Sequence, residues 1–236
     1  MADLIGTYIP DYKLELPETA ASAFRRYFEF LEEKNKVMNL TAISGEEEVY
    51  TLHFLDCLAL FKYHDFKNES VIDIGSGAGF PGLPVKIAEP TVNLTMLDAQ
   101  QKRINFLSET CDNIGLTGVN CIHARAEEAA FEKEMRGKFD CAVSRAVARL
   151  NVLCELCMPF VKTGGYFFAM KSVDSDEEIN EAKKAITTLG GELEACHDYT
   201  IPGTDVTHRV VVIKKVKETP SGYPRRFSKI SKSPIK

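Results

Sequence analysis

One segment constrains the fold of this chain more than any other: Val71-Ile72-Asp73-Ile74-Gly75-Ser76-Gly77-Ala78-Gly79-Phe80-Pro81-Gly82. Its first four residues predict a strand that runs directly into a cluster of glycines, and residues 83–88 then predict a helix. Glycine lets the backbone turn tightly and approach a ligand closely at the carboxyl end of a strand. The segment therefore predicts the first strand and helix of an open α/β sheet, with a ligand-binding crevice between them.

The rest of the chain after residue 70 alternates between short apolar runs and helical patterns. Strands are predicted at residues 71–74, 94–97, 119–122, 139–143, 166–170 and 210–213, and helices at 83–88, 100–114, 127–135, 150–161 and 176–189. Residues 192–200 and 207–216 predict a further strand pair around the turn Pro202-Gly203. This alternation is typical of a mostly parallel sheet with helices on both faces.

Two flanking segments differ from this pattern. Residues 1–66 are predicted to be helical, because Ala20, Phe24, Phe28 and Leu31 recur at spacings of four and three and residues 46–61 repeat the pattern. Pro17 suits the first position of the earlier helix. Residues 218–236 are rich in Ser, Pro and Lys and predict a tail without independent order. The expected organisation is a helical extension (1–66), an α/β domain (67–217) and a basic tail (218–236).

Composition narrows the class of protein. The chain has 236 residues, is 44% hydrophobic and carries a net charge of −5. Because it shows neither an apolar run of 18 residues nor a signal peptide, we expect a cytoplasmic protein whose seven cysteines are reduced and mostly buried. Residues 214–236 hold eight basic residues and one acid, which leaves a net charge of −12 for the remainder. Such a basic end suits contact with a polyanion, although a solvated tail would give the same count.

The glycine cluster fits two kinds of nucleoside cofactor. Residues 77–82 match the dinucleotide pattern G-x-G-x-x-G, whereas Asp73-x-Gly75-x-Gly77-x-Gly79 resembles the glycine motif of S-adenosylmethionine (AdoMet) methyltransferases. Asp98 ends the next predicted strand, where a carboxylate can accept hydrogen bonds from both ribose hydroxyls. Negative charge at Asp73 would repel a pyrophosphate and attract the amino and sulfonium groups of AdoMet. AdoMet is therefore favoured over NAD(P).

Two later strand ends supply further candidates at the same sheet edge. Ala126 and Glu127 follow the third strand, where a methyltransferase contacts adenine, and Arg145 follows the fourth, where the acceptor binds. Singly, Glu127 and Arg145 would each suit a salt-bridged helix cap; together they favour one crevice. The fourth strand is followed by neither Asn-Pro-Pro-Tyr nor Pro-Cys, so attack by an exocyclic amine or a covalent pyrimidine mechanism is unsupported. A ring nitrogen such as guanine N7 has a free lone pair and needs only alignment with the methyl group.

No metal site is expected from the sequence. The pair Cys154-Glu155-Leu156-Cys157 lacks a second pair of ligands at matching spacing, so these residues predict buried thiols on a helix. His53 and Asp56, three residues apart on a helix, have a spacing that suits a metal pair, but a polar patch facing RNA or a simple hydrogen bond is favoured. Cys141 is expected to pack in the core, and His64 has no visible partner.

The assembled motifs resemble those of the bacterial small-subunit rRNA methyltransferase G family, also called glucose-inhibited division protein B. The resemblance covers nearly the whole chain, and its most specific part is the continuation Gly-Phe-Pro-Gly at residues 79–82. The other matching motifs are Asn39-Leu40-Thr41, His53-x-x-Asp56, Leu97-Asp98, Lys102-Arg103, Ser144-Arg145-Ala146, His208-Arg209-Val210-Val211-Val212-Ile213-Lys214 and the tail Tyr223-Pro224-Arg225-Arg226 with Lys232-Ser233-Pro234-Ile235.

The resemblance implies a Rossmann-like class I AdoMet-dependent methyltransferase fold with seven strands. It also implies methylation of N7 of guanine 527, in the 530 loop of 16S rRNA, by in-line transfer without a covalent enzyme intermediate. The substrate would be the small ribosomal subunit or its assembly intermediate, and the enzyme is expected to be a monomer. Carried over by position, AdoMet would contact Gly75, Phe80, Asp98, Ala126, Glu127 and Arg145, with Arg145 as the catalytic residue. RNA would contact His53, Lys102, Arg103, Arg209, Lys214, Arg225 and Arg226.

Two other functions remain open from the sequence. An NAD(P)-dependent oxidoreductase would use the dinucleotide interpretation of residues 77–82, although no hydride-handling residue is evident. A catalytically inactive rRNA-binding module would bind RNA without retaining AdoMet.

Overall fold

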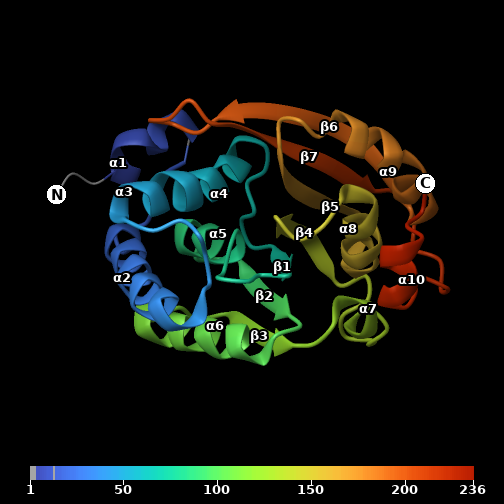
Figure 1. Ribbon diagram of the computed structural model, residues 1–236, viewed down its shortest axis with the longest axis horizontal. Helices are drawn as coiled ribbons and strands as arrows, with labels where there is room; N and C mark the ends of the chain where they lie inside the picture. Colours follow the sequence, from blue (N-terminus) through green and yellow to red (C-terminus); the bar gives the residue numbers. More distant parts are fainter. Residues whose placement is uncertain (1–3, 13) are drawn as a thin grey trace.

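A seven-stranded sheet forms the centre of the computed structural model, which describes residues 4–12 and 14–236 (Figure 1). The order of the strands across the sheet is β3-β2-β1-β4-β5-β7-β6. Their bounds are β1 (Ser70–Ile74), β2 (Asn93–Asp98), β3 (Val119–His123), β4 (Phe139–Arg145), β5 (Val161–Ser172), β6 (Gly191–Thr200) and β7 (Thr207–Lys215).

The strand directions confirm the expected Rossmann-like class I fold. Strands β1 to β5 run parallel, and β7 pairs antiparallel with both β5 and β6. The hairpin predicted around Pro202-Gly203 is present as β6 and β7. Because β1 to β4 are parallel, their carboxyl ends meet at one edge of the sheet, which is where ligands bind in open α/β sheets.

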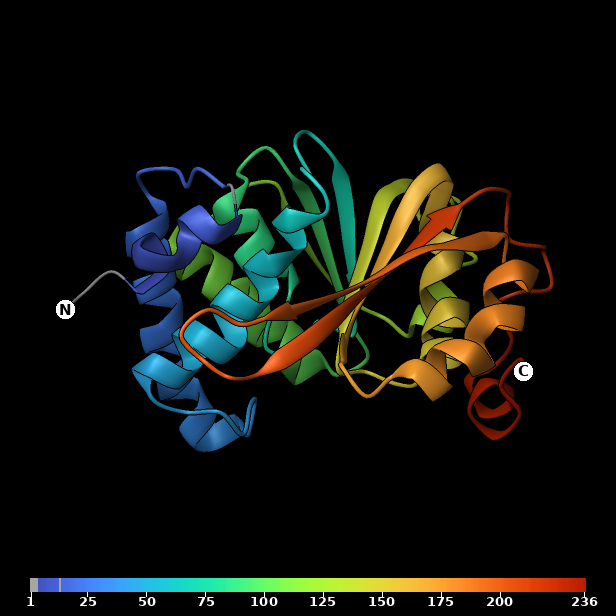
Figure 2. The same cartoon turned by 90° about the horizontal axis from the view of Figure 1, so that it is seen from above.

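Helices cover both faces of the sheet, as Figure 2 shows. One face carries α5 (Gly82–Ala88), α6 (Gln101–Ile114) and, outside them, α2 (Ala20–Met38). The other carries α8 (Leu150–Cys157), α9 (Asp176–Thr188), the short α7 (Ala126–Ala129) and α10 (Phe227–Lys232). Each face has its own apolar core, in agreement with the alternation of strands and helices in the sequence.

Most of the described residues before residue 66 are helical, and they share a core with the sheet. Besides α2 they form α1 (Leu4–Tyr8), η1 (Ile9–Tyr12), α3 (Glu46–Val49), the π-helix η2 (Tyr50–Leu55), α4 (Asp56–Leu58) and η3 (Ala59–Lys62). Phe24 and Tyr27 of α2 contact Phe54 of η2, and Phe54 contacts Phe80 of the glycine segment. The extension therefore packs directly against the loop that follows β1.

Several predicted bounds were wrong. Helix α2 begins at Ala20, whose N–H donates to the carbonyl of Pro17, so the proline precedes the helix. The helix predicted at 127–135 ends at Ala129 and continues as turns, and residues 131–134 are exposed. The segment at 150–161 divides into α8 and η4 (Met158–Phe160) before β5 begins.

The basic tail is not a loose chain end. It forms α10, buries Ile230 completely, and fixes Arg225 to the buried carboxylate of Glu155 through contacts of 2.6 and 2.8 Å. Lys215, at the start of the basic segment, is also buried, and its ammonium donates to the carbonyls of Met158 and Leu189. Within the described residues, no helix combines the length and apolar character needed to cross a membrane.

Candidate active site

A cavity of about 550 Å³ opens at the carboxyl ends of β1 to β4. A volume of this size suits a nucleoside-sized ligand. Of the residues predicted to bind the cofactor, those that line the cavity are Gly75, Gly77, Phe80, Asp98, Ala126, Glu127 and Arg145. Of those predicted to bind RNA, His53 and Arg103 line it as well. The sheet edge therefore brings together residues that lie far apart in the sequence.

The glycines after β1 give the cavity a wall of bare backbone. Gly75 has φ +72°, and a Cβ atom there would lie 2.7 Å from Cγ2 of Val147. Its N–H donates to the carbonyl of Leu97 at 2.8 Å, which ties the loop to β2. Gly77, at φ +60°, faces the cavity, and its N–H donates to the Asp98 carboxylate at 3.0 Å. Side chains at Gly75 and Gly77 would strain the backbone, so both positions favour glycine.

Asp73 and Gly79 do not line the cavity, contrary to the sequence-based prediction. Asp73 is fully buried, and its Oδ2 accepts a hydrogen bond from the N–H of Gly82, the first residue of α5, at 2.9 Å. Burial raises the pKa of this carboxyl to about 7. Gly79 leaves room for Leu83 and for the hydroxyl of Tyr27. Both residues therefore support the loop on its side away from the cavity, because the turn into α5 directs the Asp73 side chain away from the cavity.

Asp98 ends β2 with its carboxylate at the cavity. Its Oδ1 accepts from the N–H of Gln100 at 2.9 Å, and its Oδ2 accepts from Gly77 and, at 3.4 Å, from Arg103. The side chain is only 4% exposed, so these donors replace the water it loses. A carboxylate has about four acceptor sites, which leaves a site on Oδ1 for a ligand hydroxyl.

Glu127, in α7 after β3, is salt-bridged and still lines the cavity wall. Its Oε1 accepts from Nε of Arg125 at 2.5 Å, and its side chain is 9% exposed. Ile74, Leu97 and Leu156 supply apolar surface to the same cavity. An apolar slot with one carboxylate at its rim suits a flat heterocycle bearing an amino group.

Arg145 ends β4 and connects the sheet to the N-terminal extension. Its Nη1 donates to the carbonyl of Leu52 at 3.1 Å and to Oδ2 of Asp56 at 2.8 Å, and its Nη2 donates to Nδ1 of His53 at 2.7 Å. The guanidinium also lies 4.8 Å from the ring centre of Phe80. Arg145 is thus salt-bridged to Asp56 and also lies in the cavity wall.

His53 is held as a neutral imidazole. Burial, and then the charge of Arg145, lower its pKa to about 3. Because Nδ1 accepts from Arg145, the proton lies on Nε2, which donates to Oγ1 of Thr41 at 2.8 Å. The ring also stacks on Phe80 at 4.3 Å between centres. His53 therefore positions Arg145 and has no free nitrogen to serve as a base.

Asp56 was expected to lie in a polar patch facing RNA or to form a simple hydrogen bond, and it lies inside the protein in contact with several side chains. It is fully buried, and it also accepts from Tyr199 Oη at 2.6 Å and His208 Nδ1 at 2.7 Å. Burial acts to raise the pKa of Asp56, but the hydrogen bond from His208 and the charge of Arg145 together hold it below its usual value. The contacts of Tyr199 and His208 with Asp56 could not be predicted from the sequence, because only the β6–β7 hairpin brings these residues to Asp56.

A second cavity, of about 530 Å³, adjoins the first and shares His53, Arg145 and Ala146 with it. Its other walls come from η2, the end of β5, α9 and the β6–β7 hairpin. Leu52, Met170 and Val206 are apolar, whereas Lys171 and Glu178 form an ion pair at 2.6 Å. Arg145 thus stands at the junction of two adjacent cavities.

The remaining residues predicted to contact RNA lie outside both cavities. Lys102 and Arg226 are exposed, and Lys214 lies 3.9 Å from Glu194. Arg209 is buried and bound to Asp198 and Asp176 at 2.5 to 2.9 Å. Arg209 and Arg225 are therefore occupied by carboxylates of the chain itself, and the structure corrects the expectation that their guanidinium groups face RNA phosphates.

Comparison with known proteins identifies relatives along the whole chain. Residues 20–205 match the family model for rRNA small subunit methyltransferase G. Proteins named ribosomal RNA small subunit methyltransferase G are 45% identical over 235 residues in Clostridium perfringens (strain 13 / Type A), 46% over 237 in Alkaliphilus oremlandii and 48% over 227 in Clostridium botulinum (strain Loch Maree / Type A3). These alignments cover 99%, 100% and 96% of this chain and 98%, 99% and 95% of the relatives.

Solved structures share the fold at low sequence identity. A SAM-dependent methyltransferase from Aquifex aeolicus matches with a TM-score of 0.53 and 15% identity, over 71% of this chain and 93% of the other. TrmN from Thermus thermophilus matches with a TM-score of 0.51 and 20% identity, over 68% of this chain and 48% of the other. With a full-length match at this level of identity to its curated relatives, and with the glycine loop, Asp98 and Arg145 placed around one cavity, the chain belongs to the rRNA small subunit methyltransferase G family.

Proposed function

We propose that this chain transfers the methyl group of AdoMet to N7 of guanine 527, in the 530 loop of 16S rRNA. Membership of the family supports the broader activity, which is AdoMet-dependent methylation of small-subunit rRNA. The observation that carries the finer proposal is the meeting of two cavities at Arg145: one at the carboxyl ends of β1 to β4, and one beside it. A donor and an acceptor placed in adjacent cavities react by proximity and alignment.

The first cavity fits AdoMet. When bound, AdoMet supplies an electrophilic methyl group on a sulfonium. The bare backbone at Gly75 and Gly77 lets the amino acid end approach closely, because neither residue adds a side chain to the cavity wall. Asp98 accepts from the ribose hydroxyls, with the long 3.4 Å contact from Arg103 as the donor most easily displaced. Glu127 and the apolar wall receive the adenine.

The second cavity suits a guanine base. Its apolar walls from Leu52, Met170 and Val206 match the faces of a purine. Glu178 uses Oε1 for Leu150 and Lys171, so among the described residues its Oε2 accepts no hydrogen bond. A carboxylate there can accept from N1–H and the exocyclic amine of guanine, whereas adenine has no donor at N1. The acceptor base is thus recognised on the edge opposite N7.

Arg145 is proposed to touch the guanine on the edge that carries N7. A guanidinium has five N–H donors, and three are used by Leu52, Asp56 and His53. Among the described contacts two donors remain, which can bind O6 beside N7 without occupying the N7 lone pair. Asp56 balances the charge of Arg145, so the guanidinium orients the base without adding net charge to the junction.

The lining of the two cavities supports direct in-line transfer. No cysteine is found among the described residues that line them, so a covalent thiol intermediate has no nucleophile there. His53 is neutral and bonded at both ring nitrogens, so it offers no free general base. Attack by N7 needs neither group, because its lone pair carries no proton.

RNA binding is proposed to use the basic groups that remain exposed around the cavities. Arg103 lines the first cavity, Lys102 precedes it on α6, and Arg226 precedes α10 beside Glu127. These groups would hold phosphates of the 530 loop while the target base leaves its stack. We expect the chain to act as a monomer in the cytoplasm, on the small subunit or its assembly intermediate.

The experiment that tests this function incubates the purified chain with methyl-labelled AdoMet and small subunits that lack the modification. The rRNA is digested, and the labelled nucleoside is identified by mass and by N7-specific strand cleavage. A single 7-methylguanosine at position 527 supports the proposal. Label elsewhere in 16S rRNA would support the methyltransferase activity but would overturn guanine 527 as the acceptor. RNA binding with neither AdoMet binding nor methyl transfer to naked 16S rRNA, subunits or assembly intermediates would indicate the inactive RNA-binding module. The NAD(P) oxidoreductase is not favoured by the family or the fold.

A further inference from the structure

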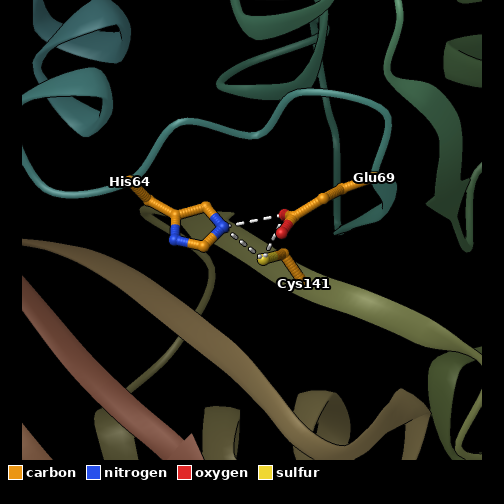
Figure 3. Close-up of side chains that lie close together, drawn as sticks. All are labelled: His64, Glu69 and Cys141. Carbon is orange, nitrogen blue, oxygen red and sulfur yellow. Dashed lines mark hydrogen bonds and ion pairs between the residues drawn. The ribbon is translucent and has the colours of Figure 1, made fainter.

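Three side chains with metal-binding atoms converge on the side of the sheet away from both cavities. Nε2 of His64 lies 2.8 Å from Oε2 of Glu69, Sγ of Cys141 lies 3.1 Å from the same oxygen, and Sγ lies 3.5 Å from the His64 nitrogen (Figure 3). One ion can therefore contact all three atoms, since ligands around tetrahedral zinc lie 2.0 to 2.3 Å from the metal. The sequence did not indicate this set of ligands, because Cys141 lies 77 residues from His64 along the chain.

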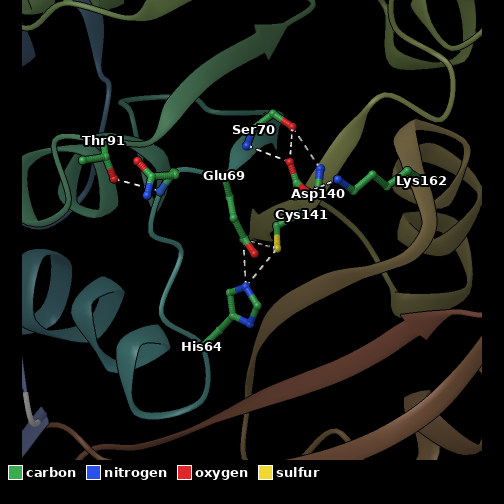
Figure 4. Close-up of polar contacts among 8 residues, drawn as sticks. His64, Glu69, Ser70, Thr91, Asp140, Cys141 and Lys162 are labelled. Atoms are coloured by element: carbon green, nitrogen blue, oxygen red, sulfur yellow. Dashed lines mark hydrogen bonds and ion pairs between the residues drawn. The ribbon is translucent and has the colours of Figure 1, made fainter.

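The cluster lies where the N-terminal extension meets the edge of the sheet at which β1 and β4 begin. His64 follows η3, Glu69 directly precedes β1, and Cys141 pairs with Val71 near the start of β4. Beside it, Asp140 bonds to Ser70 and Lys162, so the neighbouring carboxylate is already neutralised (Figure 4). None of the three cluster residues lines the cavities at the other edge.

The surroundings suit a partly enclosed ion. The His64 ring contacts Phe66, Tyr166 and Phe168 at 4.7 to 5.5 Å between centres, which fixes its plane. Cys141 is fully buried, whereas the side chains of His64 and Glu69 are 19% and 27% exposed, so an ion can enter from solvent. Burial, and then the charge of Glu69, raise the pKa of the Cys141 thiol, which stays protonated without a metal. An ion must therefore displace that proton.

We propose that His64, Glu69 and Cys141 bind Zn²⁺, with water as the fourth ligand. The thiolate and the carboxylate neutralise the two charges of the ion, and neutral His64 donates its lone pair, so the site carries no net charge. The thiol proton leaves to solvent as the sulfur–zinc bond forms. Sulfur and imidazole ligands select zinc over the oxygen-preferring Mg²⁺ and Ca²⁺.

The bound ion would clamp the extension to the sheet without entering the methyl-transfer site. It links the segment after η3 to β1 and β4, three parts of the chain that must be assembled before the cluster exists. Binding to the folded chain alone stabilises that state by mass action. Zinc is therefore expected to raise the unfolding temperature of the enzyme.

The test strips the full-length chain with a chelator and titrates it with zinc sulfate, following metal content after dialysis and the unfolding temperature. One zinc per chain and a zinc-dependent rise in unfolding temperature are expected. The His64→Gln and Cys141→Ser chains should lose that rise and bind zinc at least about tenfold more weakly, since even outer partners of a metal site change affinity by 10 to 100-fold. Cys196→Ser, which removes an exposed thiol outside the cluster, should behave as the unaltered chain.

Cobalt substitution checks the ligands directly, because a thiolate-to-cobalt charge-transfer band reports the sulfur bond. That band should be present in the unaltered chain and in Cys196→Ser, and absent in Cys141→Ser. His64→Gln, a change at a partly exposed site, keeps the test valid if Cys141→Ser does not fold. A folded unaltered chain that retains no zinc would overturn the proposal. Equal zinc affinity in the His64→Gln chain would overturn it as well.

Discussion

At the scale of single residues, each cavity contains a carboxylate with acceptor sites left for a ligand. Asp98 retains an acceptor site on Oδ1, and Glu178 retains Oε2 among the described contacts. By contrast, Asp56 uses both oxygens for Arg145, Tyr199 and His208. In the proposed function Asp98 therefore binds the ribose and Glu178 binds the edge of the base, whereas Asp56 holds Arg145 in place between the two cavities.

Replacing Asp98 with Asn should weaken AdoMet binding about 10 to 100-fold. Hydrogen bonds to a charged group contribute about 1.5 to 3 kcal/mol, and each 1.4 kcal/mol is tenfold in affinity. Calorimetric titration of AdoMet into the Asp98→Asn chain measures the change. The Asp112→Asn chain, altered at an exposed site on α6, should bind normally. An unchanged affinity in Asp98→Asn would remove this carboxylate from the ribose site.

Replacing Glu178 with Gln should act on the acceptor and leave AdoMet binding intact. Removing one well-placed hydrogen bond to a base costs about 1 to 3 kcal/mol, so kcat/KM for subunit methylation should fall about 5 to 150-fold. Single-turnover methylation with saturating AdoMet separates this decrease from cofactor binding. Glu177→Gln, the exposed neighbour on α9, provides the matched control. Equal decreases in both variants would contradict a specific contact to guanine.

At the scale of elements, two adjacent arginines in the tail have opposite environments. Arg225 is bound to Glu155, which is fully buried, whereas Arg226 is exposed with Lys229 and Lys232 of α10. Deleting the tail would leave the Glu155 carboxylate buried and unpaired, which is strongly destabilising. The contribution of the tail to RNA binding is therefore best measured by replacing its exposed basic residues with neutral ones, and not by deleting the tail.

A chain carrying Arg226→Gln, Lys229→Gln and Lys232→Gln should bind RNA more weakly and with a shallower salt dependence. Removing a basic group that binds a phosphate lowers the slope of log K against log salt by roughly one unit, so the slope should fall by up to about three. Filter binding of a 530-loop RNA across a salt series gives the slope. The Lys183→Gln and Lys184→Gln chain, altered on the exposed face of α9, should keep the original slope. An unaltered slope in the triple variant would exclude α10 from the RNA interface.

At the scale of the whole molecule, the buried carboxyl of Asp73 makes stability depend on pH. Its pKa is about 7 in the folded chain, against the usual 3.8, because burial disfavours the charged form. Between these values the folded state holds a proton that the unfolded state has lost. The stability contributed by this group is therefore present at low pH and falls as pH rises from about 4 to 7.

Exchange of Asp73 for Asn should remove that dependence while keeping a neutral side chain that can accept from Gly82. The free energy of unfolding of Asp73→Asn, relative to the unaltered chain, should rise with pH by at most about 1.4 kcal/mol per unit and level off above pH 7. Urea unfolding at intervals between about pH 5 and 8 measures it. Asp65→Asn, at an exposed site, should show a constant difference. A constant difference in Asp73→Asn would mean that the carboxyl is charged in the folded chain.

The sequence by itself determined the alternation of strands and helices, the glycine turn after β1, and the positions of Asp98 and Arg145 at strand ends. These features follow from local patterns, because apolar periodicity and glycine placement act over a few residues. Since parallel strands end at one sheet edge, the general location of the cofactor crevice followed from them too. The resemblance to a known family then indicated the reaction and its substrate, and the comparisons confirmed the family.

Only the tertiary structure decided which side chains face the ligand and which face each other. Asp73 and Asp98 both lie at the ends of strands, yet packing against α5 turns one inward and leaves the other at the cavity. The β6–β7 hairpin brings His208 to Asp56 across 152 residues, and β4 brings Cys141 to His64 across 77. Such contacts depend on how distant elements pack together, because a short-range pattern along the chain does not specify which distant side chains meet after folding.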